Sequence, residues 1–127
     1  MTNKVIVDTS VFIDFFRGKE VTAFRELLLN DRILLSHYVR LELLQGVRKE
    51  EVKKLDYVLD GLARCPFDEK CFAEAERILR QTKGSGLTLG IVDLLLAAQS
   101  NAVDASIYSF DKVFGKLAGQ KLVRLFA

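Results

Sequence analysis

The chain lacks residues on which several classes of protein depend. Its 127 residues include no tryptophan, one proline, one histidine and two cysteines. Two cysteines without clustered histidines are too few for a disulfide framework and make a poor zinc site, so we interpret them as packed thiols in a reducing compartment. Half of the residues are hydrophobic and eight are glycine. This composition excludes a fibrous repeat and argues against disorder.

Long apolar runs are also missing. The longest, at residues 91–98, is interrupted by Asp93 and followed by Gln99, and it falls short of the ~18 to 20 residues that span a bilayer. The N-terminus opens on a strand-like run rather than on a charged leader with a cleavage site. We therefore predict a compact cytoplasmic protein with no membrane partner. Without linkers or repeats, residues 1–127 are expected to form a single domain.

Four acidic residues stand in apolar surroundings, where carboxylates are unusual. They are Asp8 after the run Val5–Val7, Glu42 within Val39–Leu44, Asp93 within Ile91–Leu96, and Asp111 after Ser106–Phe110. Carboxylates in or beside a core are costly unless a positive charge compensates them. Neither Glu42 nor Asp93 has a Lys or Arg three or four residues away. We expect the fold to bring the four together around divalent cations, which prefer oxygen ligands.

Each acid also has a structural interpretation, as a helix cap, a surface residue or half of an ion pair. Four such coincidences together are less economical than one shared site. If the four are committed to metal, 13 acidic residues remain against 19 basic ones, a balance of +6. Such a surface favours a polyanionic ligand, although any single basic residue is better explained as part of a solvated helix face.

Strand-like and helix-like segments alternate along the chain. Strands are predicted at 4–8, 32–36, 105–109 and 121–126, with a break or short strand at 65–67. Helices are predicted at 11–17 after a Thr9 or Ser10 cap, at 21–29, from 36 or 37 to about 46, at 49–63, from Asp68 to a stop at 83–86, from a Thr88 cap through Asp93, and at 112–117.

This alternation predicts an α/β fold, a three-layer α/β/α sandwich around a mainly parallel sheet. The functional site of such a sheet lies outside the carboxyl ends of its strands. Asp8 and Asp111 both follow a predicted strand and fall at that edge. A helix facing the same edge could supply Glu42 and Asp93.

Four short stretches occur in order along the chain: Asp8–Ser10, Glu42–Gly46, Asp93–Ala98 and Ser109–Phe114. With these motifs at this spacing, the sequence resembles the PIN-domain family, and most closely the VapC-type toxin ribonucleases. The resemblance covers nearly the whole chain. It implies a metal-dependent endoribonuclease that hydrolyses RNA phosphodiester bonds with Mg²⁺ or Mn²⁺. It also implies a VapB-like antitoxin partner that lays a basic residue into the acidic pocket, and a homodimer.

The resemblance also assigns roles to particular residues. Asp8, Glu42 and Asp93 match the three core acids of the family pattern, and Asp111 matches the fourth, so all four are expected to be catalytic metal ligands. Two hydroxyl residues, Ser10 and Ser109, are expected to hydrogen-bond and orient the carboxylates. Many relatives carry a further Asp two residues after the fourth acid, where this chain has Val113, and the stretch 88–92 lacks their proline and extra acid.

Two other function classes remain open from the residues alone. A magnesium-dependent phosphotransfer domain would also place acids at strand ends, but it needs an acidic pair at the first strand, where only Asp8 is present. A PIN-like domain that merely binds RNA or a partner would share the motifs without the activity. His37, the single histidine, lies at a predicted helix start and is better explained as a structural residue than as a proton carrier.

Overall fold

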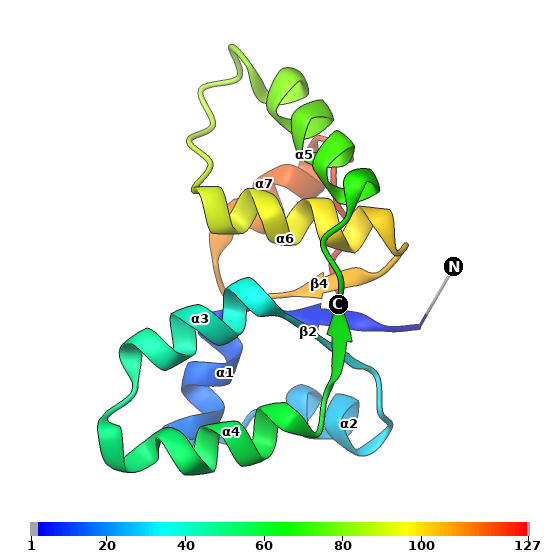
Figure 1. The fold of residues 1–127 in the computed structure, drawn as a ribbon. Coiled ribbons are helices and arrows are strands. Elements are labelled where there is room, and N and C mark those ends of the chain that lie inside the picture. The colour runs from blue at the N-terminus through cyan, green and yellow to red at the C-terminus, as the bar shows by residue number, and fades with distance from the viewer. Residues whose placement is uncertain (1–2, 127) are drawn as a thin grey trace.

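A computed structural model describes residues 3–126, which form a four-stranded sheet between two layers of helices (Figure 1). The strands are β1 (Val5–Val7), β2 (Ile33–Ser36), β3 (Ala63–Cys65) and β4 (Ser106–Tyr108). The helices are α1 (Thr9–Phe16), α2 (Thr22–Leu29), α3 (His37–Gly46), the 3₁₀ turn η1 (Lys49–Glu51), α4 (Val52–Asp60), α5 (Glu69–Thr82), α6 (Ile91–Ala102) and α7 (Lys112–Gly119).

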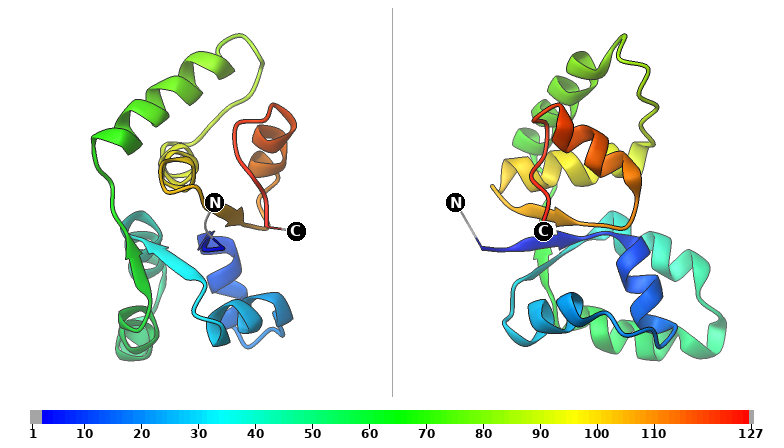
Figure 2. Two further views of the ribbon diagram at one scale, coloured as in Figure 1. Left: turned by 90° about the vertical axis from the view of Figure 1, so that its right-hand side faces the viewer. Right: turned by 180° about the vertical axis from the view of Figure 1, so that it is seen from behind.

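All strand pairings are parallel, in the order β3-β2-β1-β4. Helices α1, α2 and α4 cover one face of the sheet, and α5, α6 and α7 cover the other, as the views in Figures 1 and 2 show. Helix α3 packs against both α1 and α6 at the end of the sheet where β1 and β2 finish. The predicted three-layer α/β/α architecture with a parallel sheet is confirmed.

The apolar pattern of the sequence explains this arrangement. Residues Val5–Val7 are completely buried, as expected for a central parallel strand covered by helices on both faces. On one side the rings of Phe12 and Phe24 meet edge to face, with centroids 5.3 Å apart. On the other side Leu96 and Phe114 fill the space under α6 and α7. The core therefore has two halves separated by the sheet.

The strand order reverses next to β1, and this reversal positions the site. From β1 the chain adds β2 and then β3 on one side, and it returns to add β4 on the other side of β1. A crevice forms outside the carboxyl ends of neighbouring strands at such a reversal. Asp8 directly follows β1, and Ser109–Asp111 directly follow β4. These two segments therefore flank the crevice.

Three sequence predictions are corrected at element ends. Helix α1 begins at Thr9 rather than at residue 11, and its N-cap position is Asp8, whose side chain makes no capping hydrogen bond. Helix α6 begins at Ile91 after Gly90, so Thr88 is not its cap. The predicted last strand, 121–126, is reduced to one parallel bridge between Leu125 and Ile107, because a turn with Lys121 at positive φ delays the return to the sheet.

Other predicted features are present. Ser36 caps α3 by accepting a hydrogen bond from the Tyr38 N–H, and Asp68 caps α5 by accepting one from the Cys71 N–H. Cys65 and Cys71 are buried free thiols. Among the helices of residues 3–126, none is long and apolar enough to cross a bilayer. The cytoplasmic location stays a prediction.

Candidate active site

Asp8 is the buried centre of the candidate site. It is 5% exposed, and its Oδ2 accepts two short hydrogen bonds, from Ser10 Oγ at 2.9 Å and from Ser109 Oγ at 2.6 Å. Because each hydroxyl has one proton and both protons are committed to Asp8, the 3.3 Å approach of the two serine oxygens is a contact rather than a further hydrogen bond. Oδ1 has no hydrogen-bond partner among residues 3–126 and remains available to a ligand.

The two serines are themselves held by the loop that follows β4. The Phe110 N–H donates to Ser10 Oγ at 3.0 Å, and the Asp111 N–H donates to Ser109 Oγ at 2.9 Å. Each hydroxyl therefore accepts from the backbone and donates to the carboxylate. The hydrogen bonds expected of Ser10 and Ser109 are present: that of Ser10 to Asp8 is local, whereas that of Ser109 to Asp8 and that of the Phe110 N–H to Ser10 join segments 101 and 100 residues apart in sequence. Asp8 is fixed from both sides of the crevice.

The other three acids approach Asp8 from different elements. Asp93 lies in the first turn of α6 and is partly buried. Glu42 lies within α3 and is exposed. Asp111 is exposed at the N-cap of α7, where its Oδ1 accepts from the Val113 N–H at 3.0 Å. Glu42 and Asp111 are therefore more open to water than their apolar neighbours in sequence suggested, and the capping interpretation also applies to Asp111.

The other three acids lie close enough to Asp93 for their charges to act on it. Burial first, and then the charges of Asp8, Asp111 and Glu42 in that order, together raise the pKa of Asp93 from 3.8 to about 6. Like charges within a few ångströms disfavour ionisation in this way. Asp93 also gains some compensation from the positive end of the α6 dipole. Among residues 3–126, the charges that shift the pKa of Asp93 are therefore all negative.

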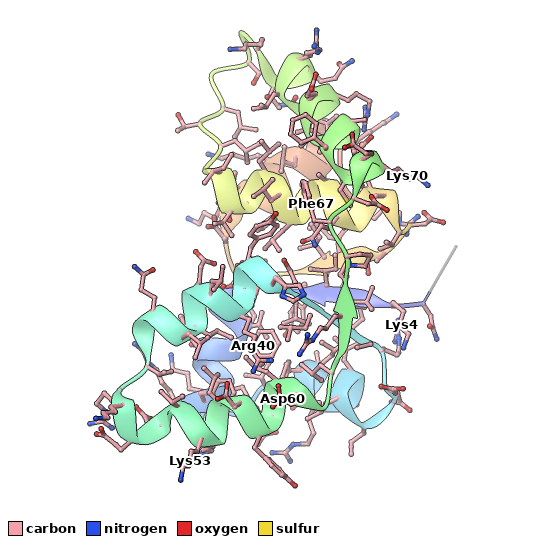
Figure 3. The ribbon with its side chains drawn as sticks, in the orientation of Figure 1. Lys4, Arg40, Lys53, Asp60, Phe67 and Lys70 are labelled. Atoms are coloured by element: carbon pink, nitrogen blue, oxygen red, sulfur yellow. The ribbon has the colours of Figure 1, made fainter. Side chains whose placement is uncertain are left out.

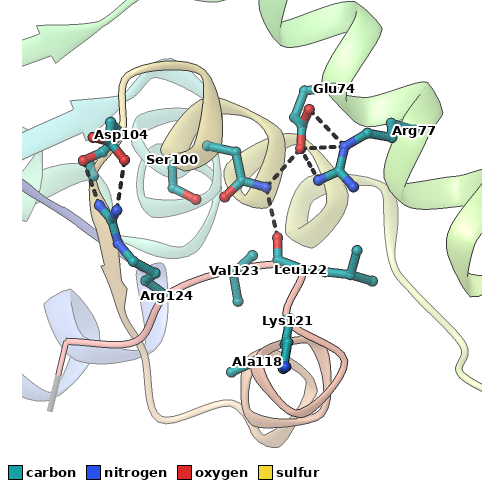
Figure 4. Close-up of a pocket in the computed structure, with 11 residues that line it drawn as sticks. Glu74, Arg77, Ser100, Asp104, Ala118, Lys121, Leu122, Val123 and Arg124 are labelled. Carbon is teal, nitrogen blue, oxygen red and sulfur yellow. Dashed lines mark hydrogen bonds and ion pairs between the residues drawn. The ribbon is translucent and has the colours of Figure 1, made fainter. Parts of the chain in front are cut away.

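One nearby basic residue, Arg40, is engaged elsewhere, whereas Arg17 lines the same hollow as Glu42. Arg40, two residues before Glu42 on α3, forms ion pairs of 2.9 Å with Asp56 and with Asp60 of α4, and the pair with Asp60 is seen in Figure 3. Away from the cluster, acids are paired in the ordinary way. Glu74 with Arg77 and Asp104 with Arg124 line a hollow of about 420 Å³ at the amino end of β4, shown in Figure 4. The four site carboxylates, by contrast, form no such ion pair within residues 3–126.

Thr9 is a site residue that the sequence did not reveal. Its hydroxyl donates to Glu42 Oε1 at 2.6 Å, so the first turn of α1 orients the carboxylate carried by α3. From sequence, Thr9 was interpreted only as a possible helix cap. Its position directly after Asp8 was the available signal, but its partner lies 33 residues away.

The donor set fits a divalent cation in chemistry and charge. Mg²⁺ and Mn²⁺ prefer carboxylate oxygens, and none of the four carboxylates forms an ion pair with a lysine or arginine in the part of the chain that the structure describes. In residues 3–126, however, no three Asp, Glu, His or Cys side chains already stand in an arrangement that could hold an ion. Like-charge repulsion favours such an open arrangement. Closing it requires side-chain adjustments, most simply of the two exposed acids, Glu42 and Asp111.

A parallel sheet covered by helices, with acidic side chains where the strand order reverses, places the chain in the class of α/β domains that have an acidic functional site. Comparison with known proteins makes this specific. The model of the PIN domain family matches residues 5–120. Ribonuclease VapC19 of Mycobacterium tuberculosis is 31% identical over 105 residues, covering 80% of this chain and 84% of that protein. Ribonuclease VapC3 of Methanocaldococcus jannaschii is 31% identical over 93 residues, covering 73% and 94%.

A solved structure agrees at the level of the fold. The structure of VapBC2 from Rickettsia felis, bound to a DNA fragment from its promoter, has a chain that superposes with a TM-score of 0.80 at 23% identity, covering 96% of both chains. The chain described here belongs to the PIN-domain family. The resemblance drawn from its four acidic motifs is confirmed.

Proposed function

We propose that the chain is a metal-dependent endoribonuclease and the toxin of a toxin–antitoxin pair. The observation that carries the proposal is the convergence of Asp8, Glu42, Asp93 and Asp111 on one crevice, seen in the raised pKa of Asp93. Family membership and the names of the two ribonuclease relatives support it. The proposed cofactor is Mg²⁺ or Mn²⁺.

We propose that the four acids bind the ion. Asp8 offers Oδ1, because both serine hydroxyls occupy its Oδ2. Glu42 is aimed by Thr9, and Asp111 has one oxygen left beside its cap to α7. When bound, divalent cations lower the pKa of water and stabilise charge on phosphate oxygens. The chain's own contribution is to fix Asp8 and to orient Glu42, so that the adjustments needed to bind the ion fall mainly on the two exposed acids, Glu42 and Asp111.

A cleavage assay tests the proposal directly. End-labelled RNA is incubated with the purified chain in Mg²⁺, Mn²⁺ or EDTA, and the product ends are sequenced to find the cleaved positions. We expect cleavage with either metal and none in EDTA. Asp8→Asn should lose it while its circular dichroism spectrum is unchanged. Asp14→Asn is the matched control, since Asp14 lies on α1 near Lys19 and outside the cluster. Equal cleavage by the Asp8 variant would refute the assignment.

The antitoxin proposal is supported by a hollow beside Glu42. It measures about 240 Å³ and is lined by side chains of α1, α3 and the turn after α3. Ile13, Phe16, Leu43 and Val47 give it an apolar wall next to the acidic cluster. A peptide with an apolar anchor followed by a basic residue would match both features. Co-expression with the neighbouring open reading frame should yield a complex in which cleavage is suppressed.

We also propose a homodimer. Exposed apolar side chains remain on the helices, with Leu29 77% and Leu41 63% exposed, and unpartnered apolar surface favours association. Much of the apolar surface of α1 and α2 is already buried in the core, however, since Phe12, Phe24 and Leu27 are buried. Light scattering after size exclusion at several concentrations decides between one copy and two.

A further inference from the structure

We propose that Phe110 is a stacking platform for an unpaired nucleobase of the RNA, beside the carboxylate cluster. This inference rests on the proposed ribonuclease function and names a contact that makes single-stranded RNA the preferred substrate. The position of Phe110 in the chain is the first observation that supports it. Phe110 stands between Ser109, which holds Asp8, and Asp111, which belongs to the cluster.

The backbone of Phe110 is fixed by the site itself. Its N–H donates to Ser10 Oγ at 3.0 Å, and the next N–H, of Asp111, donates to Ser109 Oγ at 2.9 Å. The loop between β4 and α7 is therefore anchored at two consecutive residues. A ring on this loop keeps a defined position relative to Asp8, so a base stacked on it would place the adjoining phosphate reproducibly.

The ring is exposed although it sits next to the core. Phe110 is 49% exposed, whereas Phe114 one turn later is 1% exposed and fills the space under α7. Packing therefore does not require an aromatic residue at position 110. Ile91, two residues before Asp93, is also exposed, at 66%, but it is aliphatic and has no π face to offer. Phe110 is the aromatic side chain that stands next in sequence to a cluster acid.

The orientation of the ring is already restricted from one side. Its centroid lies 5.6 Å from that of Tyr108 with the planes at 85°, and Tyr108 packs in turn against Phe126 at 5.2 Å. Such edge-to-face contacts limit the rotamers of Phe110. Less conformational entropy is then lost when a base stacks on the exposed part of the ring.

The residues that follow favour RNA over a protein partner. Lys112 and Lys116 are exposed one turn apart on α7, and neither forms an ion pair within residues 3–126. Aromatic platforms beside cations that follow the phosphate backbone are the usual design of single-strand sites. Tyr108 and Phe126 extend the apolar surface on one side of Phe110, but its neighbours in sequence, Ser109, Asp111 and Lys112, are polar or charged. A docking face for a protein is more continuously apolar.

The experiment uses the absence of tryptophan from the chain. Phe110→Trp introduces a single fluorophore at the proposed platform, and Phe72→Trp is the matched control. Phe72 is 56% exposed on α5 and borders a hollow that Arg77 and Arg80 also line, so it too lies beside cations. Both changes are made together with Asp93→Asn so that RNA stays intact in Mg²⁺. Each protein is titrated with a short uridine oligomer and with an abasic ribose-phosphate oligomer of equal length.

We expect saturable quenching of the tryptophan at position 110 by the uridine oligomer, weak quenching by the abasic oligomer, and little change at position 72. In the otherwise unaltered chain, Phe110→Ala should reduce kcat/KM for RNA about 10-fold to 100-fold, the range typical of one lost base stack. Phe110→Leu keeps apolar bulk without a π face and should resemble Phe110→Ala. If leucine restores activity, the role is packing and the inference is wrong.

The remaining outcomes separate this inference from the function on which it rests. If the unaltered chain cleaves RNA but position 110 is not quenched and Phe110→Ala binds labelled RNA equally well, the platform is refuted and the ribonuclease stands. If Phe110→Ala leaves RNA binding intact and weakens antitoxin binding instead, the ring belongs to the protein interface and the inference also fails. If the unaltered chain neither binds nor cleaves RNA, both proposals fall.

Discussion

Replacing Asp93 with asparagine should stabilise the metal-free protein at neutral pH. Burial first, and then the charges of Asp8, Asp111 and Glu42, raise the pKa of Asp93 from 3.8 to about 6. Because the folded-state pKa lies above the unfolded value, the folded protein binds this proton more tightly. Stability therefore falls as pH rises from about 4 to about 6, and the full cost persists above that range.

The size of the effect follows from the shift. A change of roughly 2 units corresponds to about 3 kcal/mol, but Asp93 is only partly buried, so screening by water reduces this to about 1 to 2 kcal/mol. Asparagine removes the cost of burying a charge and the repulsion from the other acids, and it also removes a carboxylate from the first turn of α6, where it favours the helix by about 0.3 to 1 kcal/mol. Burial and repulsion together are the larger effect, and we expect a net gain of about 1 kcal/mol.

Urea unfolding followed by circular dichroism measures this gain in EDTA. Asp93→Asn should exceed the unaltered chain in free energy of unfolding near pH 7.5, and the difference should vanish near pH 4. Adding Mg²⁺ should stabilise the unaltered chain more than the variant, because a ligand stabilises the state that binds it.

Glu74→Gln provides a control of opposite sign. A hydrogen bond from Arg77 lowers the pKa of Glu74, so the stability that Glu74 contributes is present above its unfolded pKa and is lost as pH falls through its folded pKa. This variant should be less stable than the unaltered chain at neutral pH. If Asp93→Asn is also destabilising at every pH, neither burial nor the neighbouring carboxylates disfavour the Asp93 charge and the reasoning is wrong.

Three further predictions concern the site and the thiols. Thr9→Val removes the 2.6 Å hydrogen bond to Glu42 and should raise the Mg²⁺ concentration for half-maximal cleavage about 10-fold, whereas Thr9→Ser should not; equal metal dependence would exclude an orienting role. Mn²⁺ binding measured by calorimetry should weaken as pH falls below about 6, where Asp93 takes up its proton, and pH-independent binding would exclude Asp93 as a ligand. Burial raises the pKa of Cys65 to about 12 and also raises that of Cys71, so neither thiol should react with Ellman's reagent before urea unfolds the protein; rapid reaction in the native state would contradict their burial.

The sequence was sufficient for the elements whose apolar pattern is strong. The β-branched run Val5–Val7 is compatible with few structures other than a buried parallel strand, and its burial confirms this prediction. Once β1 and β4 are both parallel strands, the residues that follow them must meet at one edge of the sheet. The approach of Asp8 to Asp111 was thus predictable from order alone, without any knowledge of distances.

The element ends were less predictable because side chains there serve the site instead of the helix. Thr9 and Ser10 are good capping residues, yet their hydroxyls donate to Glu42 and Asp8. A local rule assigns such residues to the helix start, since it cannot detect a partner 33 residues away. Gly90 has no side-chain oxygen to act as a cap, and α6 begins at Ile91 directly after it without a side-chain cap.

Both hydrogen bonds from serine hydroxyls to Asp8 can be present together only when β1 and β4 are paired. Ser10 follows β1 and Ser109 follows β4, and the two strands pair along Val5–Val7 and Ser106–Tyr108. The Asp8 N–H donates to the Tyr108 carbonyl at 2.9 Å, so the last backbone hydrogen bond between β1 and β4 is made by the residue that carries the carboxylate. A fold that had paired β1 with β2 alone would leave Asp8 with one serine and no partner loop. The same strand pairing that completes the core therefore completes the acidic crevice, and a substitution that loosens β4 should weaken the site before it unfolds the rest.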